Sequence, residues 1–122
     1  MPDPLIQLAD IGRSFHLGDS TVHALQGLNL SIGRGEYCAV TGPSGSGKST
    51  LMNLIGLLDR PDRGHYRFDG RDVTTLSDTE QARLRSQQIG FVFQSFHLVP
   101  RLSAADNIAL PLILAGIPAA ER

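Results

Sequence analysis

The segment that decides the fold is Gly42-Pro43-Ser44-Gly45-Ser46-Gly47-Lys48-Ser49-Thr50. From residue 42 to residue 49 it satisfies the pattern G-x-x-x-x-G-K-[ST], which is typical of loops that bind phosphate groups. Glycines allow the backbone to curl so that successive N–H groups point at phosphate oxygens. Residues 42–50 are therefore predicted to bind the phosphates of a nucleotide.

Two side chains of this loop have predicted roles of their own. The ammonium group of Lys48 should reach the β- and γ-phosphates, and the hydroxyl group of Ser49 should ligate Mg²⁺. A helix that begins near Lys48 would add the positive end of its dipole. The alternative is a flexible glycine turn with a solvated lysine, and the flanking sequence decides between the two.

The flanking sequence predicts a strand before the loop and a helix after it. Tyr37–Val40 is β-prone and has few polar residues, which suits a strand buried on both faces. Lys48–Leu58 has apolar residues at helical spacing, namely Leu51, Leu54, Ile55 and Leu58. The order of strand, glycine-rich loop and helix is the context that a phosphate-binding loop requires. Kinases, GTPases, helicases and transporters share this context, so the loop alone does not choose among them.

Further strands and helices are mixed along the rest of the chain. Strands are predicted at Leu5–Leu8, at 28–32, at His65–Phe68 and at Ile89–Phe93. The dipeptide Asp69-Gly70 favours a hairpin turn directly after the third of these. Such a mixture indicates the α/β class.

Two capping patterns predict where further helices begin. Ser77 with Glu80 three residues later forms a capping-box pattern, which opens a polar helix. Ser103 with Asp106 is the same kind of start signal for a last helix. Proline lacks the N–H that a helix interior uses, so this last helix is expected to be kinked or broken at Pro111.

The composition is globular and narrows the classes of function. Of 122 residues, 41% are hydrophobic and 19% charged, and the net charge is −1. No long basic block is present, so no nucleic-acid partner is expected. The single cysteine, Cys38, excludes an internal disulfide and is predicted to be a small core residue. The longest apolar run, Ile108–Ile117, is shorter than the ~20 residues of a membrane-spanning helix, so any membrane link is expected to come through a partner.

Three stretches together resemble an ABC ATPase. They are GPSGSGKSTLMNLIGLLDRPDRG (42–64), HYRFDGRDV (65–73) and IGFVFQSFHLVPRLSAADNIALPL (89–112). The resemblance runs from Leu5 to the end of the chain and is greatest to the macrolide-export, lipoprotein-release and FtsE-like group. It implies a phosphate-loop NTPase fold of the ABC type, with residues 1–122 as the N-terminal part of one nucleotide-binding domain. That part would hold an antiparallel β subdomain and a portion of the core sheet.

The resemblance also assigns two residues outside the phosphate loop. Phe15, in Gly12-Arg13-Ser14-Phe15, matches the aromatic residue that stacks on adenine, although an ordinary structural phenylalanine is the alternative. Gln94 matches the glutamine that ligates Mg²⁺ or holds a water near the γ-phosphate, although a polar strand end is the alternative. With these additions, the expected ligands are ATP and Mg²⁺. Lys48 and Gln94 are the expected catalytic residues, and Ser49 and Gln94 the metal ligands.

The family's partners follow from the same resemblance. A transporter ATPase couples ATP binding and hydrolysis to export or lipoprotein release through a membrane permease, and it works with a second ATP-binding subunit. The chain is thus expected at the cytoplasmic face of the cell membrane, bound there through its permease. Residues 95–106 would face the permease, or else would serve only local packing.

Several parts of a complete ABC ATPase are absent from these 122 residues. They are the second strand ending in Asp-Glu, the glycine-rich signature motif and the downstream histidine. We therefore expect the N-terminal part of a longer domain, which does not hydrolyse ATP usefully alone, because no carboxylate orients the attacking water. Two alternatives remain open: a non-transport ABC protein of DNA repair or translation, and a catalytically dead ATP-binding fragment. A kinase or GTPase is disfavoured because FVFQSFHLVP, residues 91–100, has no role in those classes.

Overall fold

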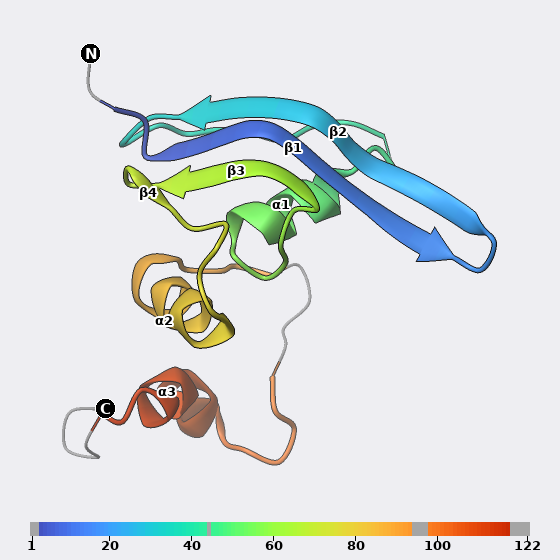
Figure 1. Ribbon diagram of the computed structural model, residues 1–122. Coiled ribbons are helices and arrows are strands. Elements are labelled where there is room, and N and C mark those ends of the chain that lie inside the picture. The colour runs from blue at the N-terminus through green and yellow to red at the C-terminus, as the bar shows by residue number, and fades with distance from the viewer. Residues whose placement is uncertain (1–2, 44, 94–97, 118–122) are drawn as a thin grey trace. The chain divides into compact units, whose positions relative to one another are not determined.

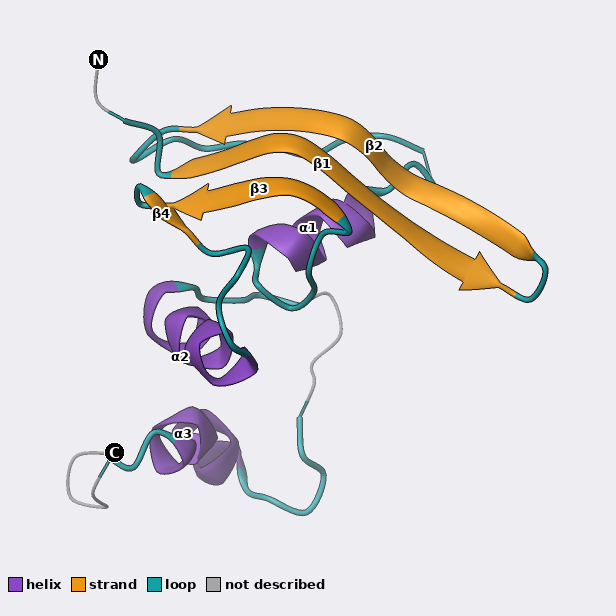
Figure 2. Ribbon diagram, viewed as in Figure 1, coloured by secondary structure: helices purple, strands orange, loops and turns teal. Residues whose placement is uncertain are grey.

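The computed structural model describes residues 3–43, 45–93 and 98–117. The chain divides into two compact units, Met1–Phe91 and Val92–Arg122. The described part of the first unit contains an antiparallel sheet and two helices, and the described part of the second contains one helix (Figures 1 and 2).

A long antiparallel hairpin dominates the first unit. Strands β1 (Ile6–Leu17) and β2 (Ser20–Ile32) pair along their whole length, from Ile6 opposite Ile32 to Leu17 opposite Ser20. Strand β3 (Arg63–Phe68) lies on the other side of β1, and the short β4 (Arg71–Asp72) closes the order β2-β1-β3-β4. The sheet is therefore antiparallel throughout, as Figure 2 shows.

Strand β1 is longer than the sequence pattern predicts, because a bulge interrupts its alternation. Only Leu5–Leu8 reads as a strand, yet pairing continues to Leu17. Asp10 has a left-handed φ of 51°, and the register shifts between Leu8 and Ile11. The two buried residues Leu8 and Ile11 are consequently three positions apart rather than two. The alternation of apolar and polar residues that identifies a strand is therefore broken at this point.

The predicted strand at His65–Phe68 and the turn after it are confirmed. Strand β3 begins close to the bulge of β1, where Gly64 has a φ of +92°. A Cβ atom at Gly64 would collide with the carbonyl oxygens of Ala9 and Asp10, so only glycine fits there. Asp69 and Gly70 both have positive φ, as a two-residue type I′ hairpin turn requires.

Helix α1 (Lys48–Ile55) covers one face of this sheet and shares its core. Ile11 and Leu54 are the largest fully buried side chains of the core. The phenolic hydroxyl of Tyr66 donates to the carbonyl oxygen of Ile55 at 2.7 Å, and burial raises the pKa of this phenol. This bond links the C-terminal end of α1 to β3.

Helix α2 (Asp78–Gln88) begins at the predicted capping box. Ser77 Oγ accepts the N–H of Glu80 at 3.2 Å and donates to the Glu80 carboxylate at 3.0 Å. From the buried face of the helix, Gln81 Nε2 donates to the carbonyl oxygen of Leu57 at 2.7 Å. Because Leu57 follows α1, the bond joins the two helices of the first unit.

Two predicted buried strands are not formed. Neither Tyr37–Val40 nor Ile89–Phe93 pairs with another strand in the part of the chain that the structure describes. Tyr37 and Val92 are fully exposed, and Cys38 is exposed as well, so the prediction of a core cysteine is wrong. Apolar composition favours a buried strand, but a strand of that kind also needs neighbouring strands for its backbone N–H and C=O groups.

In the second unit, α3 (Ala104–Leu114) starts where the capping signal predicts. Ser103 Oγ accepts the N–H of Asp106 at 3.1 Å. The helix is not broken at Pro111 and continues to Leu114. Asn107, four residues before the proline, uses its side chain to accept the N–H of Val99 at 2.8 Å, which ties the preceding loop to the helix.

Candidate nucleotide-binding site

The backbone of the phosphate loop is fixed against strand β2. Gly47 is the N-cap of α1 and has a φ of +96°, a conformation that glycine adopts readily. A Cβ atom at Gly47 would lie 2.6 Å from the carbonyl oxygen of Ala24 in β2, which is too close for any side chain. The helix then starts with the Leu51 N–H donating to the Gly47 carbonyl oxygen at 2.9 Å.

The electrostatics of this loop suit an anion. The first N–H groups of a helix have no acceptor within it, and Gly47 supplies no side-chain cap. The first turn of α1 also contains no acidic residue that would offset the positive end of the helix dipole. Lys48 Nζ donates to the carbonyl oxygen of Gly42, which holds the ammonium group beside the loop. A cation and a helix N-terminus thus occupy one short segment, the arrangement that binds phosphate groups.

A pocket of about 460 Å³ joins this loop to the β1–β2 hairpin. This volume lies within the range of roughly 300–1,000 Å³ that small-molecule sites have. The residues that line it are Phe15, Val22, His23, Ala24, Gly45, Gly47, Lys48, Ser49 and Thr50. The structure therefore brings the predicted adenine-stacking residue and the second half of the phosphate loop to the walls of one pocket.

Phe15 lies on the hairpin opposite Val22, and its ring has a cationic neighbour. The guanidinium carbon of Arg13 is 4.4 Å from the centroid of the Phe15 ring, which is the geometry of a cation–π contact. Arg13 is not among the residues that line the pocket.

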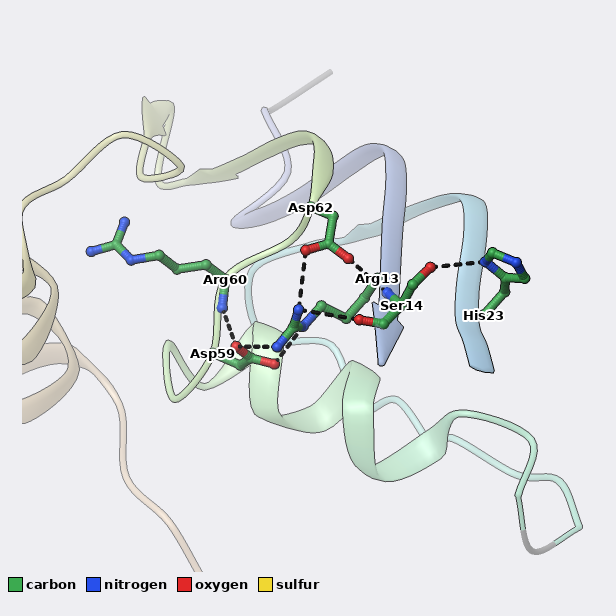
Figure 3. Close-up of polar contacts among 6 residues, drawn as sticks. All are labelled: Arg13, Ser14, His23, Asp59, Arg60 and Asp62. Carbon is green, nitrogen blue, oxygen red and sulfur yellow. Dashed lines mark hydrogen bonds and ion pairs between the residues drawn. The ribbon is translucent and has the colours of Figure 1, made fainter. Parts of the chain in front are cut away.

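Arg13 belongs to a polar cluster that sequence reasoning missed (Figure 3). Arg13 Nε is 2.9 Å from Asp59 Oδ2, and Arg13 Nη1 is 3.0 Å from Asp62 Oδ1. The Ser14 N–H donates to Asp62 at 2.7 Å, and this bond together with Arg13 lowers the pKa of that carboxyl. Asp59 and Asp62 are 46 and 49 positions from Arg13 in the sequence, so no local sequence pattern predicts the cluster.

The remaining predicted site residues either lie outside the pocket or are not described by the structure. Gly42, Pro43 and Ser46 belong to the loop but do not line the pocket. Ser44 and Gln94 lie outside the described residues, so their predicted roles have no structural counterpart here. The described residues contain no group of three or more His, Cys, Asp or Glu that could hold a metal ion.

A glycine-rich loop that opens a helix beside a pocket of this kind defines a phosphate-loop nucleotide-binding domain. The sequence profile of the family described as ABC transporter matches residues 25–122 of this chain. The chain belongs to the ABC transporter family, as the resemblance predicts.

Curated relatives and solved structures agree with this assignment. A macrolide export ATP-binding/permease protein of Nitrobacter winogradskyi is 56% identical over 122 residues, which are 100% of this chain and 19% of the relative. A pyoverdine export ATP-binding/permease protein of Pseudomonas fluorescens is 55% identical over 123 residues, with the same shares. The chain spans about a fifth of the length of these relatives.

Among solved structures, a dimeric ATP-binding cassette bound to ADP and phosphate is 42% identical, with a TM-score of 0.84. The match covers 89% of this chain and 47% of that cassette. The predicted fold class, an ABC-type ATPase, is thereby confirmed. No helix in the described ranges is long and apolar enough to cross a membrane.

Proposed function

We propose that the chain binds ATP with Mg²⁺ in the pocket between the phosphate loop and Phe15, as part of a transporter that exports its substrate. The observation that supports this most is the shared pocket, in which Phe15 and Lys48 both take part. In this arrangement, loop N–H groups and Lys48 bind the phosphates, and Phe15 stacks on the base. Stacking gives affinity without reading base edges, so selectivity for adenine over other bases is expected to be modest.

Mg²⁺ fits the chemistry of the loop. Mg²⁺ prefers oxygen ligands and is usually held by few protein groups together with substrate phosphates and water. Ser49 lines the pocket next to Lys48, and its hydroxyl group is proposed as one such ligand. Gln94 is proposed as a second ligand, through its amide oxygen. When bound, the ion would neutralise charge on the phosphates.

A permease and a second ATP-binding subunit are the proposed partners. The curated relatives are named as ATP-binding/permease proteins, and the solved cassette is a dimer. In the second unit, Leu98 has 63% of its surface exposed, and Ile108 in α3 has 78%. Exposed apolar residues of this kind suit contact with a protein partner, which would hold the chain at the membrane. The export names of the relatives favour transport over a role in DNA repair or translation.

The proposal is tested by replacing Lys48 in the full-length protein. Lys48→Ala removes a charged hydrogen-bond donor, so the affinity for ATP with Mg²⁺ should fall on the order of ten-fold or more. A titration with a fluorescent ATP analogue measures this. Arg71→Gln is the matched control, because it removes one cation from an exposed ion pair with Glu80 outside the pocket. Equal affinity in Lys48→Ala and the wild type would refute the phosphate site.

A further inference from the structure

The guanidinium group of Arg13 lies over the ring of Phe15. It also bonds to two carboxylates that follow helix α1 (Figure 3). Asp59 binds the guanidinium group at two points, with Nε to Oδ2 at 2.9 Å and Nη2 to Oδ1 at 3.3 Å. Asp62 accepts from Nη1 at 3.0 Å. The Arg13 and Asp59 side chains are only 23% and 28% exposed. A planar guanidinium group with bonds on several sides has a fixed orientation.

These bonds make Arg13 a poor candidate for a direct phosphate ligand. One guanidinium group faces two carboxylates, so the cluster as a whole is anionic. Four of its five N–H donors have acceptors in Asp59, Asp62 and the carbonyl oxygen of Ser14. Arg13 also does not line the pocket of the phosphate loop. The effect of Arg13 on a nucleotide must therefore pass through a neighbour.

That neighbour is Phe15. The two residues are two positions apart on β1, and the guanidinium carbon of Arg13 is 4.4 Å from the ring centroid. An aromatic ring has two faces, and Arg13 covers one of them. Phe15 lines the pocket and Arg13 does not, so the face of the ring that Arg13 leaves uncovered is the one available to a base.

The cluster also ties strand β1 to the segment that follows helix α1. Helix α1 begins in the phosphate loop at Lys48 and ends at Ile55, and Asp59 follows four residues later. The ion pair between Arg13 and Asp59 thus joins the strand of Phe15 to the segment that leaves the helix of the phosphate loop. Neither partner of this pair belongs to the phosphate loop itself.

On the basis of the ATP site proposed above, we propose that Arg13 is a positioning residue for base binding. Asp59 and Asp62 hold its guanidinium group, which supports one face of Phe15 so that the other face is placed for stacking. Arg13 increases the affinity for the base of a nucleotide and contributes nothing to the binding of its phosphates.

The test compares ATP with tripolyphosphate, which has phosphates but no base. In the full-length protein, Arg13→Gln should weaken ATP binding about three- to five-fold, the scale of a lost cation–π contact. Tripolyphosphate affinity should stay unchanged. In a Phe15→Ala background, Arg13→Gln should have no further effect on ATP, because its contribution passes through that ring.

Asp59→Asn is a second variant that loosens Arg13 while keeping the volume of the side chain, and it replaces Arg13→Gln if that variant fails to fold. Arg71→Gln again serves as the control, with ATP affinity expected at the wild-type value. Equal losses for ATP and tripolyphosphate, unchanged ATP affinity, or a full effect in the Phe15→Ala background would each overturn the positioning role. Failure of the ATP site itself would show differently, as an ATP affinity independent of Lys48.

Discussion

The two ends of the proposed nucleotide pocket are built in different ways. The phosphate end comes from consecutive residues, 42–50, and relies on backbone N–H groups and one lysine. The proposed base end is formed by residues of β1 and β2, and contacts between side chains such as Arg13 and Asp59 support it from outside the pocket. A backbone site depends on stereochemistry that tolerates no added atom, whereas a side-chain site can lose one contact and still function. The effects of substitutions should therefore differ greatly between the two ends.

The largest effect is expected at Gly47. A Cβ atom introduced by Gly47→Ala would lie 2.6 Å from the Ala24 carbonyl oxygen, at a φ of +96°, so the loop must move away from β2. Affinities for ATP and for tripolyphosphate should both fall on the order of ten-fold or more, because displaced N–H groups lose charged partners. Isothermal titration with each ligand measures the change.

Gly18→Ala is the control for left-handed backbone strain without a collision. Gly18 lies at the tip of the β1–β2 hairpin with a φ of +62°, and nothing lies within 4 Å of its added Cβ atom. This variant should lose only about 1 kcal/mol of stability and keep its affinity for both ligands. If Gly47→Ala bound as well as Gly18→Ala, the close approach of loop and strand would not matter for binding.

A smaller effect is expected at the base end. Phe15→Ala should weaken ATP binding by about 1 kcal/mol, or about five-fold, which is the scale of an aromatic contact. Tripolyphosphate should bind the variant and the wild type equally, since it has no base to stack. Phe15→Tyr keeps the ring and should keep the affinity for ATP. Equal losses for both ligands in Phe15→Ala would mean that the ring is structural only.

The smallest effect concerns acid stability through Asp62. Its ionised form accepts the Ser14 N–H and bonds to Arg13, and these contacts lower its pKa below the ordinary value of 3.8. A carboxyl with a depressed folded-state pKa stabilises the fold above its unfolded-state pKa, and this is lost as the pH falls through the folded-state value.

Asp62→Asn should therefore be slightly less stable than the wild type at neutral pH, and the difference should shrink below about pH 3.8. Urea unfolding of both proteins across the acid range measures the change. A difference that stayed constant with pH would show that the charge of Asp62 contributes nothing.

Local signals predicted the local parts of this structure well. The helix after the loop is confirmed, although it ends at Ile55 rather than at Leu58. The turn at Asp69-Gly70 and the helix starts at Ser77 and Ser103 are confirmed as well, because each depends on residues close in sequence. The extent of β1 could not be predicted, since the left-handed residue Asp10 breaks the alternation that marks a strand.

Features that depend on distant partners were missed or were wrong. Tyr37–Val40 has the composition of a buried strand, but composition cannot supply the neighbouring strands that such a segment needs. The contact of Arg13 with Asp59 and Asp62 joins segments far apart in the chain, and neither end has a local pattern that reveals it. Only the family resemblance predicted that Phe15 and the phosphate loop would belong to one site, and both line the same pocket.

The most direct test asks whether one ligand occupies both ends of the pocket at once. A fluorinated phenylalanine placed at position 15 of the full-length protein reports on the ring through its ¹⁹F resonance. We expect ATP with Mg²⁺ to shift this resonance, and tripolyphosphate to leave it in place while competing with ATP for the loop. A resonance that did not move at saturating ATP, in a protein whose binding still depends on Lys48, would contradict a single site formed by Phe15 and the phosphate loop.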